Sequence, residues 1–166
     1  RRHHLAMERP GVKRKIVYVS GTRADFGLLR TTLLRMHADP RIELSIAVTG
    51  MHLEARFGHT VDEISAAGLP IALRIPNDLA RSDGLSMAHA LATSLEGFAQ
   101  GFSTLRPDLV LVLGDRGEML AGALAALHLN IAVAHIHGGE RSGTIDESIR
   151  HAISKLAHYH FTATAQ

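Results

Sequence analysis

The chain has 166 residues, which is enough for one domain that buries roughly 70% of the surface its unfolded form exposes. Because it contains no cysteine, a disulfide framework and a thiolate metal site are excluded, and a reducing, cytoplasmic compartment is the simplest expectation. Apolar residues make up 46% of the chain but aromatic residues only 4%, so aliphatic side chains must fill the interior, and the formal net charge is only +2.

Residues 1–14 form a basic leader that we expect to be disordered or to be the remnant of an expression vector. The first fifteen residues hold six basic side chains and one acid, whereas the rest of the chain carries twelve basic and fifteen acidic residues. The body is therefore mildly acidic, which argues against a nucleic-acid partner. The leader lacks the apolar core of a signal peptide and no run approaches transmembrane length, so we expect no membrane partner either.

From residue 15 onward, apolar runs alternate with helical patterns. We expect strands at residues 16–19, 42–48, 71–75, 109–113 and 131–136, and the start of a sixth at 161. We expect helices at residues 26–36, 59–67, 86–105, 118–127 and 146–158, and a mobile loop at 77–85. Strand then helix, five times over, predicts an α/β fold: an open, parallel, Rossmann-like sheet with helices on both faces. Residues 15–166 would form this domain, and because the chain ends as a strand begins, we expect it to be the first half of a larger protein.

Ligands of such sheets bind at the carboxyl ends of the strands, so the residues that follow each strand are the candidates for a site. After the first strand, Gly21 and the start of a helix offer backbone N–H groups, and Arg23 adds a positive charge. This combination favours an anionic ligand. The alternative is a simple capped turn in which Asp25 interacts with the helix dipole. The glycine spacing does not match a dinucleotide-binding fingerprint.

The junctions after the second and fourth strands each carry one candidate. His52 follows a glycine turn and, taken alone, is an ordinary exposed histidine. Asp115 and Arg116 directly follow a buried strand, where Asp115 can project into a crevice. The alternative for Asp115 is an N-cap, with Glu118 completing a capping box.

The junction after the fifth strand is the richest in titratable groups. His135 and His137 alternate with an apolar residue, which predicts that both project to one face; without a third ligand at diagnostic spacing we expect hydrogen-bonded neutral histidines and no metal. Glu140 lies on a glycine-flanked loop and has no evident structural duty. Asp146 lies four residues before Arg150, so an ion pair along the helix is the alternative to a chemical role.

The same helix start has a structural explanation for one of its acids. Thr144 and Glu147 have the spacing of a capping box, which would account for Glu147. The acids left over, Asp115, Glu140 and Asp146, would gather at one end of the sheet and raise one another's pKa values. The sequence therefore predicts proton-transfer chemistry on a phosphorylated or nucleotide-linked substrate.

Five motifs in this order carry a family resemblance: residues 21–29 (GTRADFGLL), 49–53 (TGMHL), 114–116 (GDR), 135–140 (HIHGGE) and 145–155 (IDESIRHAISK). They resemble the hydrolysing UDP-N-acetylglucosamine 2-epimerases, especially the branch that serves sialic and legionaminic acid synthesis. The resemblance implies the N-terminal half of a glycosyltransferase-B-like fold, with the second, nucleotide-binding domain absent. It also implies a homo-oligomer at full length, a nucleotide-sugar substrate, and neither metal nor redox cofactor.

The resemblance also implies a mechanism: a base removes the proton at carbon 2 while UDP departs, and water adds to the resulting 2-acetamidoglucal to give N-acetylmannosamine. Asp115 and Asp146 would be the catalytic acids and bases, and Arg23 would approach the diphosphate. A third family carboxylate falls at His137, so either His137 acts or Glu140 takes over. The substrate-binding set would be Gly21, Arg23, Asp25, His52, Arg116, Gly139 and Arg150.

Two alternatives remain beside the epimerase: a non-catalytic nucleotide-sugar binding domain, and a glycosyltransferase of similar fold. We expect the 166-residue chain alone to be inactive, because a crevice between two domains would position the substrate. The choice between UDP and GDP, and between N-acetylglucosamine and a deoxy-diacetamido sugar, stays open at this level.

Overall fold

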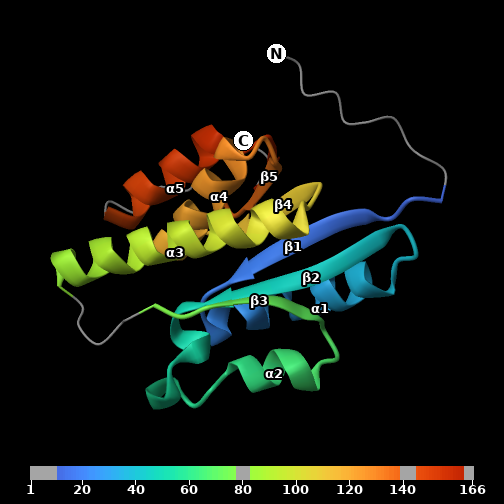
Figure 1. Cartoon of the computed structure of the whole chain (residues 1–166), viewed down its shortest axis with the longest axis horizontal. Helices are drawn as coiled ribbons and strands as arrows, with labels where there is room; N and C mark the ends of the chain where they lie inside the picture. Colours follow the sequence, from blue (N-terminus) through green and yellow to red (C-terminus); the bar gives the residue numbers. More distant parts are fainter. Residues whose placement is uncertain (1–10, 78–82, 139–144, 163–166) are drawn as a thin grey trace.

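A single parallel sheet, covered by helices on both sides, organises the chain in the computed structural model, which describes residues 11–77, 83–138 and 145–162 (Figure 1). The strands are β1 (Arg14–Ser20), β2 (Ile42–Thr49), β3 (Ile71–Ile75), β4 (Leu109–Leu113), β5 (Ala132–Ile136) and β6 (Tyr159–Phe161). They lie in the order β3-β2-β1-β4-β5-β6, and each neighbouring pair is parallel. The predicted open, parallel, Rossmann-like sheet is therefore confirmed.

The helices divide between the two faces as predicted. The helices are α1 (Arg23–Ala38), α2 (Val61–Ala66), α3 (Gly84–Leu105), α4 (Gly117–His128) and α5 (Ile145–Leu156), and two short 3₁₀ turns, η1 (Gly50–Leu53) and η2 (Ala55–Phe57), follow β2. In Figure 1, α1 and α2 lie on one side of the sheet, and α3, α4 and α5 on the other. Among the described residues, no helix combines the length and the apolar character needed to cross a bilayer.

The side chains of β1 point alternately into two separate cores. Val17 and Val19 pack in the core beneath α3, α4 and α5, whereas Ile16 and Tyr18 pack in the core beneath α1 and α2. Successive side chains of a strand point to opposite faces, so one apolar run supplies both layers. This is why β1 and β4, buried on both sides, lack the polar alternation of a half-exposed strand.

Two glycines let α3 lie directly on the strand β3. A Cβ built on Gly97 would come within 2.5 Å of the Ile75 side chain, and one on Gly101 within 2.4 Å of Leu73. Larger residues at either position would push the helix away from the sheet, so close helix–strand packing explains both glycines.

The element boundaries differ from the prediction mainly at helix starts. The first helix begins at Arg23, three residues before the predicted start at 26, because Thr22 caps it. Similarly, Asp83 caps α3 by accepting the Ser86 N–H at 3.0 Å, so that helix begins at Gly84. Residues 78–82 of the predicted loop lie outside the described residues.

The strand order reverses between β1 and β4, and this reversal marks the expected place of a ligand site. In open α/β sheets ligands bind outside the carboxyl ends of the strands at such a switch point. The segments that begin at Gly21 after β1 and at Gly114 after β4 therefore flank the candidate site.

Candidate active site at the carboxyl ends of the strands

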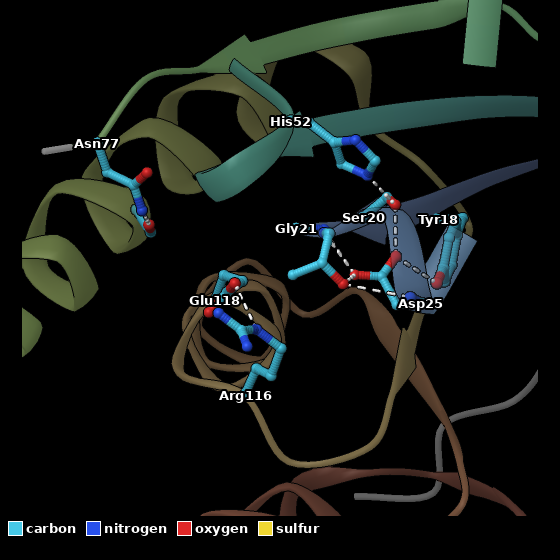
Figure 2. Close-up of polar contacts among 10 residues, drawn as sticks. Tyr18, Ser20, Gly21, Asp25, His52, Asn77, Arg116 and Glu118 are labelled. Atoms are coloured by element: carbon cyan, nitrogen blue, oxygen red, sulfur yellow. Dashed lines mark hydrogen bonds and ion pairs between the residues drawn. The ribbon is translucent and has the colours of Figure 1, made fainter. Parts of the chain in front are cut away.

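Five hydrogen bonds converge on the carboxylate of Asp25, which is only 6% exposed (Figure 2). Its Oδ1 accepts from the hydroxyls of Tyr18, at 3.1 Å, and Ser20, at 2.5 Å. Its Oδ2 accepts from the N–H of Gly21 at 3.0 Å and from the N–H and hydroxyl of Thr22 at 2.7 and 3.0 Å. Burial, followed by the charge of Asp25, raises the pKa of the Tyr18 hydroxyl well above its ordinary value.

These contacts occupy two of the N–H groups at the helix start on which the predicted anion site rests. The N–H groups of Gly21 and Thr22, which were to face the ligand, instead donate to Asp25 within the loop. The capped-turn alternative is confirmed, because Thr22 and Asp25 form a capping box at the start of α1.

His52 is completely buried, so its interpretation as an ordinary exposed histidine was wrong. Its Nε2 lies 2.8 Å from the Ser20 hydroxyl and its Nδ1 lies 2.8 Å from the Thr60 hydroxyl. Because the single proton of Ser20 goes to Asp25, Ser20 must accept from Nε2–H, and Nδ1 must accept from Thr60. Burial lowers the pKa of His52, although the charge of Asp25 acts in the opposite direction, so the neutral form of the ring is favoured.

Glu118 lies between the loops that follow β1 and β2. A Cβ on Gly21 would fall 2.5 Å from Glu118 Oε1, and one on Gly50 would fall 3.2 Å from the same atom. The carboxylate accepts from Arg116 Nε at 2.8 Å (Figure 2). Although burial acts against it, the charge of Glu118 raises the pKa of the Arg116 guanidinium above its ordinary value.

The capping interpretation of Asp115 and Glu118 was wrong. Arg116 occupies the N-cap position of α4, and Glu118 bonds to the Arg116 guanidinium. Asp115 instead accepts a hydrogen bond from Arg150 Nη2 and forms an ion pair with it. The Asp115 side chain is 26% exposed and that of Arg150 only 10%, so a nearly buried cation of α5 holds a carboxylate that still reaches solvent.

His135 is buried and its two ring nitrogens have different partners. Nε2 lies 2.7 Å from the Gly114 carbonyl, which can only accept, so Nε2 carries the proton. Nδ1 then accepts from the Ser154 hydroxyl at 3.1 Å. Burial lowers the pKa of His135, as expected for a hydrogen-bonded neutral histidine. Its bond to Gly114 fixes the backbone directly before Asp115.

The expectation that His137 shares a face with His135 was wrong. β5 ends at Ile136, and His137 adopts a left-handed conformation with φ of 58°, which takes it out of the strand alternation. Its N–H donates to the Phe161 carbonyl at 2.9 Å, and its side chain is exposed.

Asp146 lies exposed in the first turn of α5, one helical turn before Arg150. In the same helix, Glu147 lies 4.0 Å from the ring of His151. The predicted cap of this helix involves Thr144, which lies outside the described residues. The candidates Gly139 and Glu140 lie outside them as well.

Arg23 extends along the surface from the first turn of α1. It pairs with Glu63 of α2 at 2.9 Å, with 73% of its side chain exposed. In the portion of the chain that the structure describes, no cluster of three or more metal-ligating side chains occurs.

The sequence patterns did not indicate three members of the buried network. Tyr18, Ser20 and Thr60 each supply a hydroxyl to it. One signal was available for Tyr18, which is a polar-tipped residue in the middle of an otherwise apolar strand. For Thr60 the sequence held no comparable signal, because its partner lies eight residues earlier in a 3₁₀ turn.

The fold defines an α/β domain with an open, parallel, Rossmann-like sheet whose strand order reverses between β1 and β4. A family model for UDP-N-acetylglucosamine 2-epimerase matches residues 34–166. The chain belongs to the UDP-N-acetylglucosamine 2-epimerase family.

Relatives and a solved structure support this assignment. The chain is 61% identical over 151 residues to a hydrolysing UDP-N,N'-diacetylbacillosamine 2-epimerase of Legionella pneumophila, covering 91% of this chain and 40% of that protein. It is 42% identical over 152 residues to a hydrolysing GDP/UDP-N,N'-diacetylbacillosamine 2-epimerase of Campylobacter jejuni, covering 91% and 39%. A Methanocaldococcus jannaschii UDP-GlcNAc 2-epimerase, solved in complex with UDP-GlcNAc and UDP, matches with a TM-score of 0.75 at 25% identity, covering 90% and 40%. The chain thus spans about two-fifths of the length of the relatives it matches.

Proposed function

We propose that this chain is part of a hydrolysing 2-epimerase that acts on a UDP-linked 2-acetamido sugar. The observation that carries the proposal is the ion pair between Asp115 and Arg150 at the carboxyl ends of β4 and β5, with Asp146 exposed one helical turn before Arg150. This arrangement supplies two carboxylates that reach solvent at the edge of the sheet where ligands of such folds bind. The 61% identity to a relative named for UDP-N,N'-diacetylbacillosamine favours that deoxy-diacetamido sugar over N-acetylglucosamine.

The reaction needs groups that exchange protons at carbon 2. A base removes the carbon-2 proton while the bond from carbon 1 to the diphosphate oxygen breaks, and the electron pair leaves with UDP. Water then adds its oxygen to carbon 1, and a proton returns to carbon 2 from the opposite face. One water is consumed, and UDP and the free 2-epimeric sugar are released.

We assign Asp115 and Asp146 to the two proton transfers, because they project from different elements, the β4–α4 loop and α5. Arg150 holds Asp115 in place, and His135 fixes the preceding carbonyl of Gly114. His137, exposed at the end of β5, is the third candidate at the sugar.

Arg23 and Arg116 are assigned to the diphosphate. Both guanidiniums lie on segments that begin at the carboxyl ends of strands, and each has a carboxylate partner, Glu63 and Glu118 respectively. The loop N–H groups are committed to Asp25, so these side chains would supply the positive charge.

The test is carried out on the protein extended to the length of its relatives. With UDP-N,N'-diacetylbacillosamine or UDP-N-acetylglucosamine as substrate in deuterated water, we expect UDP release and one deuterium at carbon 2 of the free sugar. Asp115→Asn and Asp146→Asn should each lower kcat by about 10²–10⁴-fold. Asp108→Asn is the matched control, because Asp108 precedes β4 as Asp115 follows it and accepts the Lys15 N–H at 2.9 Å at the opposite end of the sheet.

Each alternative has its own outcome in this assay. Binding of nucleotide sugar without UDP release would identify a binding domain, and sugar transfer to an added acceptor would identify a glycosyltransferase. Either result, or full activity of Asp115→Asn, would overturn the proposal. The 166-residue chain by itself is expected to show no turnover, because much of the positioning would come from a second domain.

A further inference from the structure

We infer that His52 is a positioning residue: through Ser20 on one side and Thr60 on the other, it fixes the start of α1 without touching substrate. The inference rests on the proposed function, because Arg23, the first residue of α1, is the group assigned there to the diphosphate. It concerns a residue that is completely buried and that therefore acts only through its neighbours.

A chain of hydrogen bonds runs from α2 to α1 through the interior. Thr60 occupies the N-cap position of α2 and lies 2.8 Å from His52 Nδ1. His52 Nε2 lies 2.8 Å from the Ser20 hydroxyl, which lies 2.5 Å from Asp25 in the first turn of α1. Segments from β1, η1, α1 and the start of α2 are thereby tied together at one point.

A surface contact closes this chain into a ring. Arg23 of α1 pairs with Glu63 of α2 at 2.9 Å, so the two helices joined inside by His52 are joined outside by the ion pair. Arg23 lies two residues before Asp25, and Glu63 lies three residues after Thr60. The start of α1 is thus linked to the start of α2 inside, through His52, and at the surface, through this ion pair.

The buried part of the ring has one consistent arrangement of protons. Asp25 only accepts, so Ser20 donates to it, His52 donates to Ser20, and Thr60 donates to His52. Removal of one member leaves a buried polar group without its partner, which costs more than the bond itself contributed. The arrangement therefore favours a single loop geometry, as buried polar networks do when every member is satisfied.

Two substitutions of His52 test the hydrogen bonds of its two ring nitrogens separately. Both are made in the protein extended to the length of its relatives. His52→Gln can place an amide N–H near the Nε2 position and keep the bond to Ser20, whereas His52→Asn can retain only an acceptor for Thr60. We expect His52→Asn to raise KM for the nucleotide sugar by about 10-fold with kcat within about threefold, and His52→Gln to recover most of the loss. Ser20→Ala should match His52→Asn, and the double variant should be no worse than Ser20→Ala.

Thr49→Val is the matched structural control. The Thr49 hydroxyl donates to the Ile75 carbonyl at 2.7 Å, a buried bond directly before η1 that lies outside the ring. We expect this variant to lower the unfolding temperature without raising KM. If His52→Asn and Ser20→Ala behave like Thr49→Val, the role of His52 is merely structural and the inference is overturned.

Hydrogen exchange separates this inference from the proposed function. The N–H groups of Gly21 and Thr22 donate to Asp25, so their protection reports the loop geometry whether or not the protein is an epimerase. We expect protection to fall at least about fivefold in Ser20→Ala and to be unchanged in Thr49→Val. Unchanged protection in Ser20→Ala overturns the inference, whereas absence of UDP release by the unsubstituted protein overturns only the proposed function.

Discussion

At the two corners of the carboxyl edge of the sheet, a carboxylate has opposite surroundings. At the β1–β2 corner, defined by Ser20, Asp25 and His52, the carboxylate is 6% exposed and accepts five hydrogen bonds from the protein. At the β4–α5 corner, defined by Asp115 and Arg150, the carboxylate side chain is 26% exposed and is held by a guanidinium.

This contrast separates positioning from chemistry. A general acid or base must exchange its proton with the substrate or with water, so it needs an accessible oxygen. Asp115 meets that requirement, whereas Asp25 lies within a closed set of donors. The two corners share an edge of the sheet, but the Asp115 carboxylate reaches solvent whereas the Asp25 carboxylate is enclosed by donors of the protein.

The largest expected effect is on stability, and it should distinguish the two carboxylates. Asp25→Asn places an amide among donors that need an acceptor, so we expect the free energy of unfolding to fall by about 3 kcal/mol. Asp115→Asn keeps an oxygen that can accept from Arg150 at a site open to water, so a loss of about 1 kcal/mol or less is expected. Urea unfolding of both variants measures the difference, and equal losses would contradict the division between the corners.

Substitution of two glycines tests the packing of the β1–β2 corner, with a smaller expected change in stability. Gly21→Ala puts a methyl 2.5 Å from Glu118 Oε1 and should destabilise the protein by about 1–3 kcal/mol. Gly27→Ala, in the middle of α1 with open space around its Cβ, should instead stabilise by about 0.5–1 kcal/mol. Thermal unfolding of the two variants gives the comparison, and shifts of the same sign would show that Glu118 yields easily.

Local patterns predicted the fold because each element is specified by its own residues. The apolar runs at 109–113 and 131–136 became β4 and β5, and the parallel order followed from strand–helix alternation. Helix starts were less certain, because they depend on capping contacts such as that between Thr22 and Asp25.

The chemistry of the site was only partly predictable, because partners distant in the sequence decide it. Local spacing left Asp115 evenly between a cap and a chemical role, because its partner Arg150 lies 35 residues further along the chain. His52 is buried because η1 turns it towards Ser20, 32 residues earlier, and no periodicity predicts that contact. His137 left the strand pattern through a left-handed backbone, which is uncommon for a residue other than glycine.

Acid should destabilise the β1–β2 corner through His52. Burial lowers the pKa of His52 in the folded protein, although the charges of Asp25 and Glu63 oppose the shift. In the unfolded chain the pKa of His52 is about 6.5, so the unfolded chain binds more protons than the folded one as pH falls below that value. The free energy of unfolding should decrease from pH 7.5 to pH 5, and His52→Gln should flatten the slope. An unchanged slope in that variant would assign the acid sensitivity to other groups.

The smallest expected effect comes from the exposed ion pair between Arg23 and Glu63. The Arg23 and Glu63 side chains are 73% and 44% exposed, so their ion pair contributes at most about 1 kcal/mol. Glu63→Gln should therefore change KM by no more than about fivefold, and the difference should vanish near 1 M salt, where the Debye length is about 3 Å. The effect of Ser20→Ala should persist at that salt concentration, because the hydrogen bonds it breaks are buried. Steady-state kinetics at low and high salt compare the two variants directly. If both effects vanish together, the β1–β2 corner is open to water and its buried network does not control the position of α1.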